Sequence, residues 1–188
     1  MKLRLAAQKD VPTLLDIYGH YISSEITFEY VLPTLEEFSQ RVSSISAYYP
    51  YLVLEEEGKV LGYAYAHPIA ERAAYAWGAE LSIYLSPDVT GLGLGKRLYV
   101  TLIGLLRFQG VRTVYGLVAS PNPASEALHK SLGFEVMGIQ HRAGYKNGRW
   151  IDLLWFEKGI AFYDPEPAPL IPFPHLPEQQ VQRLLNHF

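Results

Sequence analysis

The sequence predicts one α/β (α+β) domain with a mixed central sheet of about seven strands. Apolar residues alternate along the chain between helical spacing and a period of two, which gives expected elements in the order β-α-α-β-β-β-α-β-α-β-β. A strand, a long helix and another strand in the second half require a crossover, so these two strands are expected to be parallel within the mixed sheet. The length of 188 residues fits one domain, and a 49% hydrophobic content suffices for a core.

The first elements are a short strand and two helices. Residues 2–6 alternate like a strand, and Asp10 followed by Pro12 is typical of a helix start, with Asp10 as the N-cap. A second helix is expected to begin after Thr34, with Glu37 completing a capping box, and to end near residue 47.

The middle of the chain predicts a hairpin, a strand and a long helix. Residues 51–56 and 60–66 are strand-like and flank a tight turn at Gly58. Residues 79–85 alternate with a period of two, and residues 94–109 carry leucines on one helical face.

The remaining predicted elements are a strand at 113–118, a helix at 123–132 and strands at about 134–140 and 150–157. We expect these to complete a domain over residues 1–163.

Residues 164–188 differ in composition from the rest of the chain. Six prolines lie between residues 165 and 177 and disrupt regular elements, which predicts a Pro-rich arm. A short helix is expected near its end, around residues 178–185.

Charge and composition exclude several classes. A net charge of −3 without a basic stripe argues against nucleic-acid binding. The chain has no cysteine, which excludes disulfides and thiolate metal sites, and no His and acidic cluster has metal-ligand spacing, so we expect no metal. The N-terminus is too short and too charged for a signal peptide, and no apolar run could span a membrane, so we expect a soluble cytoplasmic protein without membrane contact.

A glycine-rich loop precedes the helix expected at 94–109. It reads Thr90-Gly91-Leu92-Gly93-Leu94-Gly95-Lys96-Arg97. Glycines allow close approach of the backbone to a ligand, and a helix N-terminus favours phosphates, although a plain loop before a helix explains the pattern too. A Walker loop is excluded because Arg97 follows Lys96, and a dinucleotide loop would follow the first strand.

A second segment reads Asn-x-x-Ser-x-x-Leu-His-x-x-x-Gly-Phe over residues 122–134. Capping alone could explain it, with Asn122 as the N-cap and Gly133 as the C-cap of one helix.

Together, the two segments resemble the GNAT family of N-acetyltransferases over about residues 2–158. The resemblance implies acetyl-CoA as co-substrate, with the pantetheine on the strand before the glycine loop and the pyrophosphate on the loop itself. The implied cofactor-binding residues are Ile83, Tyr84, Leu85, Thr90, Gly91, Leu92, Gly93, Leu94, Gly95, Lys96, Arg97, Asn122 and Ser125.

Four further segments resemble the phosphinothricin N-acetyltransferase subfamily. They lie at residues 26–38, 72–77, 80–84 and 144–152. The resemblance implies acetylation of the amino group of glutamate-like compounds, such as phosphinothricin or methionine sulfoximine, and a homodimer. The chain departs from the usual pattern at Thr90, Gly78 and Asn147.

Two residues are candidates for the proton transfers. Glu80 on the alternating strand shares a face with Ser82 and Tyr84, and apolar neighbours such as Trp77 would raise its pKa, which suits a general base; the alternative is a surface carboxylate. His129 stands where many family members have a tyrosine that protonates the thiolate; the alternative is a structural histidine.

The acceptor pocket is expected to include Phe28, Glu29, Arg72 and Tyr75. The guanidinium of Arg72 would suit a carboxylate or phosphinate. Two other functions stay open: acetylation of a polyamine or a protein N-terminus, and acetyl-CoA binding without catalysis.

Overall fold

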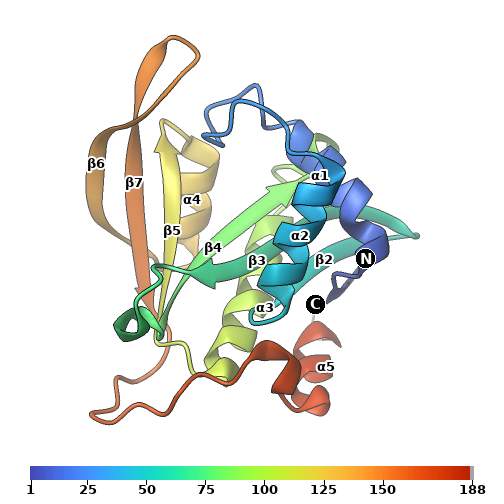
Figure 1. Ribbon diagram of the computed structural model, residues 1–188, viewed down its shortest axis with the longest axis vertical. Coiled ribbons are helices and arrows are strands. Elements are labelled where there is room, and N and C mark those ends of the chain that lie inside the picture. The colour runs from blue at the N-terminus through green and yellow to red at the C-terminus, as the bar shows by residue number, and fades with distance from the viewer. Residues whose placement is uncertain (187–188) are drawn as a thin grey trace.

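The computed structural model describes residues 1–186 and contains one mixed sheet with the strand order β1-β2-β3-β4-β5-β7-β6 (Figure 1). The strands are β1 (Lys2–Leu5), β2 (Tyr51–Glu56), β3 (Lys59–Pro68), β4 (Gly78–Leu85), β5 (Thr113–Ser120), β6 (Glu135–Lys146) and β7 (Arg149–Gly159). The helices are α1 (Val11–Gly19), α2 (Leu35–Ser46), α3 (Leu94–Gln109), α4 (Pro123–Ser131) and α5 (Glu178–Asn186). The predicted mixed sheet of seven strands is confirmed.

The parallel pair is β4 and β5, with α3 as the crossover helix between them. The pairing is short: Gly78, Ala79 and Glu80 lie opposite Thr113, Val114 and Tyr115, and no later residues of the two strands pair. Beyond this point the strands diverge, as the splayed arrows in Figure 1 show.

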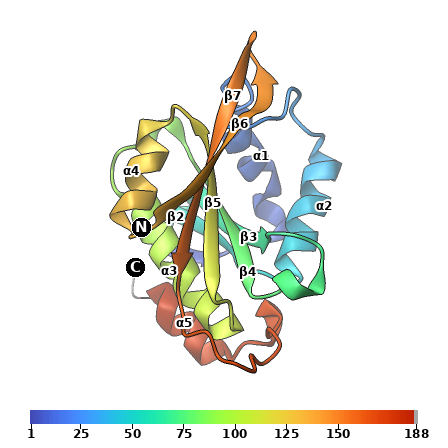
Figure 2. The ribbon, with the colours of Figure 1, turned by 90° about the vertical axis from the view of Figure 1, so that its left-hand side faces the viewer.

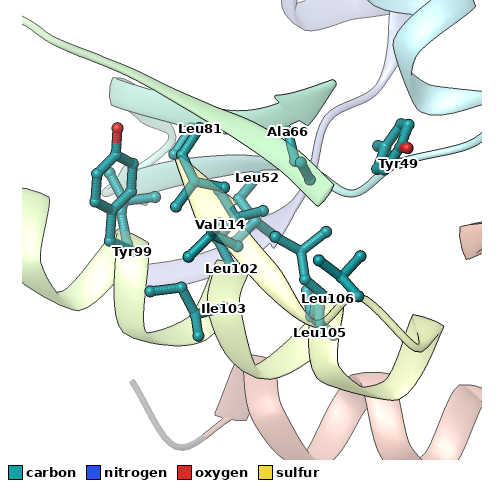
Figure 3. Packing of buried hydrophobic residues seen from close by; sticks show 14 of the residues in the cluster. Tyr49, Leu52, Ala66, Leu81, Tyr99, Leu102, Ile103, Leu105, Leu106 and Val114 are labelled. Atoms are coloured by element: carbon teal, nitrogen blue, oxygen red, sulfur yellow. The ribbon is translucent and has the colours of Figure 1, made fainter. Parts of the chain in front are cut away.

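Helices cover both faces of the sheet (Figure 2). The helices α1 and α2 pack on one face of β2 and β3, whereas α3 and α4 lie on the other face. Leucines of α3 form the main core with side chains of six strands, and Figure 3 shows Leu102 and Leu106 of α3 beside Leu52, Leu81 and Val114 of three of these strands. Each face therefore has its own apolar cluster, and the sheet between them is held on both sides.

The first helices follow the predicted capping with one correction. The side chain of Thr34 accepts from the N–H of Glu37, whose carboxylate accepts from the N–H of Thr34, which confirms the capping box. Asp10 occupies the N-cap position of α1, but the prediction that its side chain caps this helix is wrong. Its carboxylate instead accepts two bonds from the Arg4 guanidinium, at 2.6 and 2.8 Å, and one from the N–H of Ala7.

The last hairpin is longer than predicted, because β6 and β7 extend to the turn at Asn147 and Gly148. Both turn residues have positive φ, 51° and 78°, the conformation that a two-residue hairpin turn requires. A register shift between Gln140 and Gly144, with Arg142 at a φ of 53°, interrupts the ladder at the point where the first of the two predicted strands was expected to end.

The Pro-rich arm packs against the domain from which it emerges. Trp77 Nε1 donates to Ala168 O at 2.9 Å, and the N–H of Ile171 donates to Gln109 O at 2.9 Å. Five apolar side chains of the arm belong to the α3 core cluster: Leu170, Phe173, Leu176, Val181 and Leu185. No helix within residues 1–186 has the length and apolar character needed to cross a bilayer.

Candidate active site

A cavity of about 260 Å³ opens where β4 and β5 separate. We call it the wedge cavity. Its walls come from β4, β5, α3, α4 and the loop at residues 26–28. The lining includes Glu80, Ser82, Tyr99, Asn122, Ser125 and His129. Segments far apart in the sequence therefore meet at the point where the parallel pairing ends.

The edge of β4 offers backbone groups to this wedge. The N–H of Ser86 donates to Leu61 O on β3. Along an antiparallel pair, the N–H groups of every second residue point toward the partner strand. The N–H groups of Ile83 and Leu85 therefore point away from β3. The Tyr21 hydroxyl donates to Leu85 O at 2.6 Å and contacts Leu85 N at 3.3 Å. The exposed edge is therefore centred on Ile83, and Tyr21 covers Leu85, which the sequence did not indicate.

The glycine loop lies directly before α3. Gly91 and Gly93 have φ values of 77° and 76°, and no atom lies within 4 Å of a Cβ added at either residue. Gly93 is the N-cap of α3, and the first turn carries Lys96 and Arg97, both exposed. An open loop at the positive end of a helix has the geometry of a phosphate site. Thr90 bonds within the loop, from its hydroxyl to Pro87 O at 3.0 Å.

Helix α4 begins at the wedge cavity. Asn122 Oδ1 accepts from the N–H of Ser125 at 3.2 Å, which confirms Asn122 as its N-cap. The C-cap of α4 is Leu132 rather than Gly133, and Gly133 follows it with a φ of 76°, the left-handed conformation common just after a helix. Asn122 and Ser125 both line the cavity, so their capping role leaves them within reach of a ligand there.

Glu80 lies in the last residue pair before the strands separate. Its side chain is 20% exposed, and its Oε1 lies 3.7 Å from His67 Nε2. Burial raises the pKa of Glu80, and the nearby His67 lowers it by less, so the pKa is above its usual value. The indole of Trp77, which the sequence suggested as an apolar neighbour of Glu80, bonds Ala168 in the arm and packs against the α3 core.

His129 is enclosed by aromatic rings. It is 2% exposed and stacks on Phe156, with Tyr99 and Phe134 edge-on. Its Nδ1 lies 2.8 Å from Ser125 O, a carbonyl that requires a proton on Nδ1, so the neutral ring carries a lone pair on Nε2. Burial lowers the pKa of His129 despite that hydrogen bond, which favours the neutral form.

The four expected acceptor residues fall into two groups. Phe28 lines the wedge cavity, and the neighbouring Glu29 forms an ion pair with Arg41 on α2. Tyr75 lines a different cavity, at the start of β4. Arg72 precedes the short 3-10 helix Ala73–Tyr75 and is exposed. The structure thus places Phe28 and Glu80 together in the lining of the wedge cavity and leaves Arg72 and Tyr75 outside that lining, just before the start of β4.

The sequence did not reveal what holds the loop over the wedge cavity. Lys146 at the end of β6 is 3% exposed and donates to Thr27 O at 2.6 Å. The hydroxyl of Tyr18 lies 2.6 Å from Thr27 Oγ1. Lys146 is more than 100 residues from Thr27 in the sequence, and Tyr18 is 9 residues away. Neither contact could be predicted from the spacing of residues within one helix or strand.

Comparison with known proteins agrees with this geometry. The acetyltransferase (GNAT) domain model matches residues 3–155. A phosphinothricin N-acetyltransferase from Streptomyces viridochromogenes is 35% identical, over 92% of this chain and 94% of the relative. An L-methionine sulfoximine/L-methionine sulfone acetyltransferase from Salmonella typhimurium is 32% identical, over 84% and 93%.

A solved structure has the same fold. It is a GNAT superfamily phosphinothricin acetyltransferase from Sinorhizobium meliloti in complex with acetyl-CoA, with a TM-score of 0.83, 35% identity and coverage of 91% of this chain and 97% of that one. The chain therefore belongs to the GNAT acetyltransferase family and is an acetyl-transfer enzyme.

Proposed function

We propose that this enzyme transfers the acetyl group of acetyl-CoA to the primary amine of a small amino-acid-like acceptor of the phosphinothricin or methionine sulfoximine type. The observation that carries the proposal is the position of Glu80, a carboxylate of raised pKa at the mouth of the split between β4 and β5. The names of the relatives, phosphinothricin and methionine sulfoximine acetyltransferases, support this acceptor class.

Acetyl-CoA is the co-substrate of this acetyltransferase family, and the residues present suit it. The free backbone edge at Ile83 would bind amide groups of the pantetheine, with Tyr84 and Leu85 beside it. The glycine loop from Thr90 to Arg97 would bind the pyrophosphate. Asn122 and Ser125 would flank the pantetheine chain of the cofactor. When bound, acetyl-CoA supplies the acetyl group as a reactive thioester.

Glu80 is proposed as the general base. An amino group is mostly ammonium near pH 7, and it becomes nucleophilic only after it loses a proton. A carboxylate whose pKa lies closer to the working pH accepts that proton more readily. His67, 3.7 Å away, is positioned to orient Glu80.

His129 is proposed as the residue that returns a proton to the departing thiolate. The ring must first be protonated at Nε2, which burial opposes and the aromatic enclosure makes costly. A His129→Gln variant that keeps full kcat would instead assign the ring a purely structural part in α4.

A cytoplasmic homodimer is proposed as the working form. The absence of cysteine fits a reducing compartment. Large exposed apolar residues gather on the loop after α1 and on the last hairpin, among them Tyr30, Val31, Ile139 and Trp150. Gel filtration with light scattering would test the dimer, and a monomer at micromolar concentration would refute it.

The proposed reaction is tested by following free CoA thiol during incubation with acetyl-CoA and a panel of amines: phosphinothricin, methionine sulfoximine and sulfone, common amino acids, a polyamine and a peptide. Turnover of an amino acid analogue is the expected result. Turnover of the polyamine or peptide alone would point to the other acceptor classes. Tight acetyl-CoA binding without turnover of any amine would refute catalysis.

A further inference from the structure

A second cavity, of about 220 Å³, lies at the start of β4 and is separate from the wedge cavity. We call it the arm cavity, because the C-terminal arm forms one of its walls. Gly78, Thr113 and Gly159 stand in register on β4, β5 and β7, so the arm leaves the sheet beside the start of β4. Its lining combines four aromatic rings with one ion pair: Tyr75, Trp77, Tyr115, Tyr163, Arg112 and Asp164.

The arm is fixed in place on this side. Arg112 Nη2 lies 2.6 Å from Asp164 Oδ2, and Thr113 Oγ1 lies 2.8 Å from the Tyr163 hydroxyl. The Trp77 indole is bonded to Ala168 O. Two bonds of the arm and one of the preceding Tyr163 therefore hold this part of the chain against the domain.

The arm cavity is next to the proposed acceptor site. Gly78 precedes Glu80 by two residues on the same face of β4, a spacing of about 6.6 Å, and Tyr115 lies directly opposite Glu80 on β5. A Cβ at Gly78 would lie 3.1 Å from the ring of Tyr115, so glycine at this position allows that ring to close over the strand. Residues that line the two cavities therefore occupy neighbouring positions on β4 and β5.

The lining selects by charge. Arg112 is paired with Asp164, so an anionic group placed here would be attracted by one partner and repelled by the other. The Nε of Arg112 has almost no accessible surface, so a side chain in the cavity meets the paired charges of Arg112 and Asp164 rather than a free N–H group.

The lining also selects by shape. Aromatic rings favour another ring or a polarisable sulfur. The volume is below the roughly 300–1,000 Å³ of sites for drug-sized ligands, so the cavity suits a side chain and excludes a nucleotide.

We propose that the arm cavity binds the side chain of the acceptor, and that it selects uncharged amino acids with a sulfur- or ring-bearing side chain. This proposal rests on the proposed acetyl transfer with Glu80 at the amine. Methionine sulfone belongs to the selected class, whereas phosphinothricin, which carries an anionic phosphinate, does not.

The test compares kcat/KM for methionine sulfone and phosphinothricin in the full-length enzyme. The wild type is expected to favour the sulfone. Asp164→Asn leaves the charge of Arg112 without its partner, so the ratio should fall roughly fivefold toward phosphinothricin, the scale of a partly exposed ion pair. Tyr163→Ala should raise KM for the sulfone several-fold and leave KM for acetyl-CoA unchanged.

Two matched variants serve as controls. Phe162→Ala changes the neighbouring ring, which is 77% exposed and outside the cavity lining, and should leave the ratio unchanged. Tyr163→Phe keeps the ring and should retain a low KM for the sulfone. Thermal melting of each variant shows whether the fold is retained.

The outcomes separate this proposal from the acetyl transfer itself. Turnover with the same ratio in the wild type, Asp164→Asn and Tyr163→Ala would overturn the arm cavity proposal and leave the transferase proposal intact. A wild type that favours phosphinothricin would overturn it as well. If no acceptor is turned over, calorimetric titration of methionine sulfone in the presence of CoA decides: binding lost in Tyr163→Ala supports the cavity, and no binding to the wild type rejects it.

Discussion

At the scale of single residues, the burial that suits Glu80 to its proposed catalytic role also lowers the stability of the folded protein when the carboxylate is ionised. Burial raises its pKa, and the proximity of His67 offsets only part of that effect. The ionised form therefore costs more free energy in the folded protein than in the unfolded chain. This cost is present above the folded-state pKa and disappears below the ordinary value of 4.5.

Glu80→Gln should therefore stabilise the protein at high pH. Glutamine resembles the protonated carboxyl and cannot ionise, so Tm at pH 8 is expected to rise by a few degrees, with a smaller gain toward pH 4. Differential scanning calorimetry of both proteins across this range measures the effect. A variant less stable than the wild type at pH 8 would show that the His67 contact outweighs burial.

At the scale of elements, α4 and β5 meet at one close contact. His129 Nε2 lies 2.1 Å from the position of a Cβ on Gly116, so only glycine at this position accommodates the ring. The contact sets how closely α4 approaches the sheet, and with it the positions of Asn122 and Ser125 at the wedge cavity.

Gly116→Ala should destabilise the protein by about 1–3 kcal/mol, the usual range for overpacking. At roughly 2–4 °C per kcal/mol for a domain of this size, the fall in Tm is readily measured. Gly138→Ala on β6 is the matched control, because no atom lies within 4 Å of its added Cβ. Equal Tm values for the two variants would contradict the account of this contact.

Elements were predicted well where their signals are local. The capping box at Thr34 and the leucine face of α3 depend on residues three or four apart, and both agree with the structure. Asp10 was correctly predicted to occupy the N-cap position of α1, but its side chain bonds Arg4 instead of the helix, because the fold brings Arg4 beside it. In the same way, the face of Glu80 followed from alternation, whereas its neighbour His67 depends on the register between β3 and β4.

At the scale of the whole molecule, the arm and the domain share one core. The prolines in the sequence predicted the arm, but they did not predict that it packs against the domain. Residues that interrupt helices and strands do not specify which surface the segment contacts. Phe173 is 7% exposed within the α3 cluster, whereas Ile171, two residues earlier, is 43% exposed. The arm thus closes the end of the core near α3 and holds the arm cavity in place.

Phe173→Ala should lower the free energy of unfolding by about 3 kcal/mol, as expected for loss of a buried ring. Ile171→Ala, which removes a largely exposed side chain, should cost under about 1 kcal/mol. Urea unfolding followed by circular dichroism compares the two. Similar midpoints for Phe173→Ala and the wild type would mean that the arm is not part of the core in solution.

The most direct test of the central claim is the pH dependence of kcat/KM for an amino acid acceptor in the wild type and in Glu80→Gln. The wild type should gain activity as pH rises through a pKa above 4.5, because the base must be ionised. Glu80→Gln should lose about 10²–10⁴-fold and also lose that limb of the profile. A variant with wild-type activity and the same acidic limb would contradict the assignment of Glu80 as the base in the split between β4 and β5.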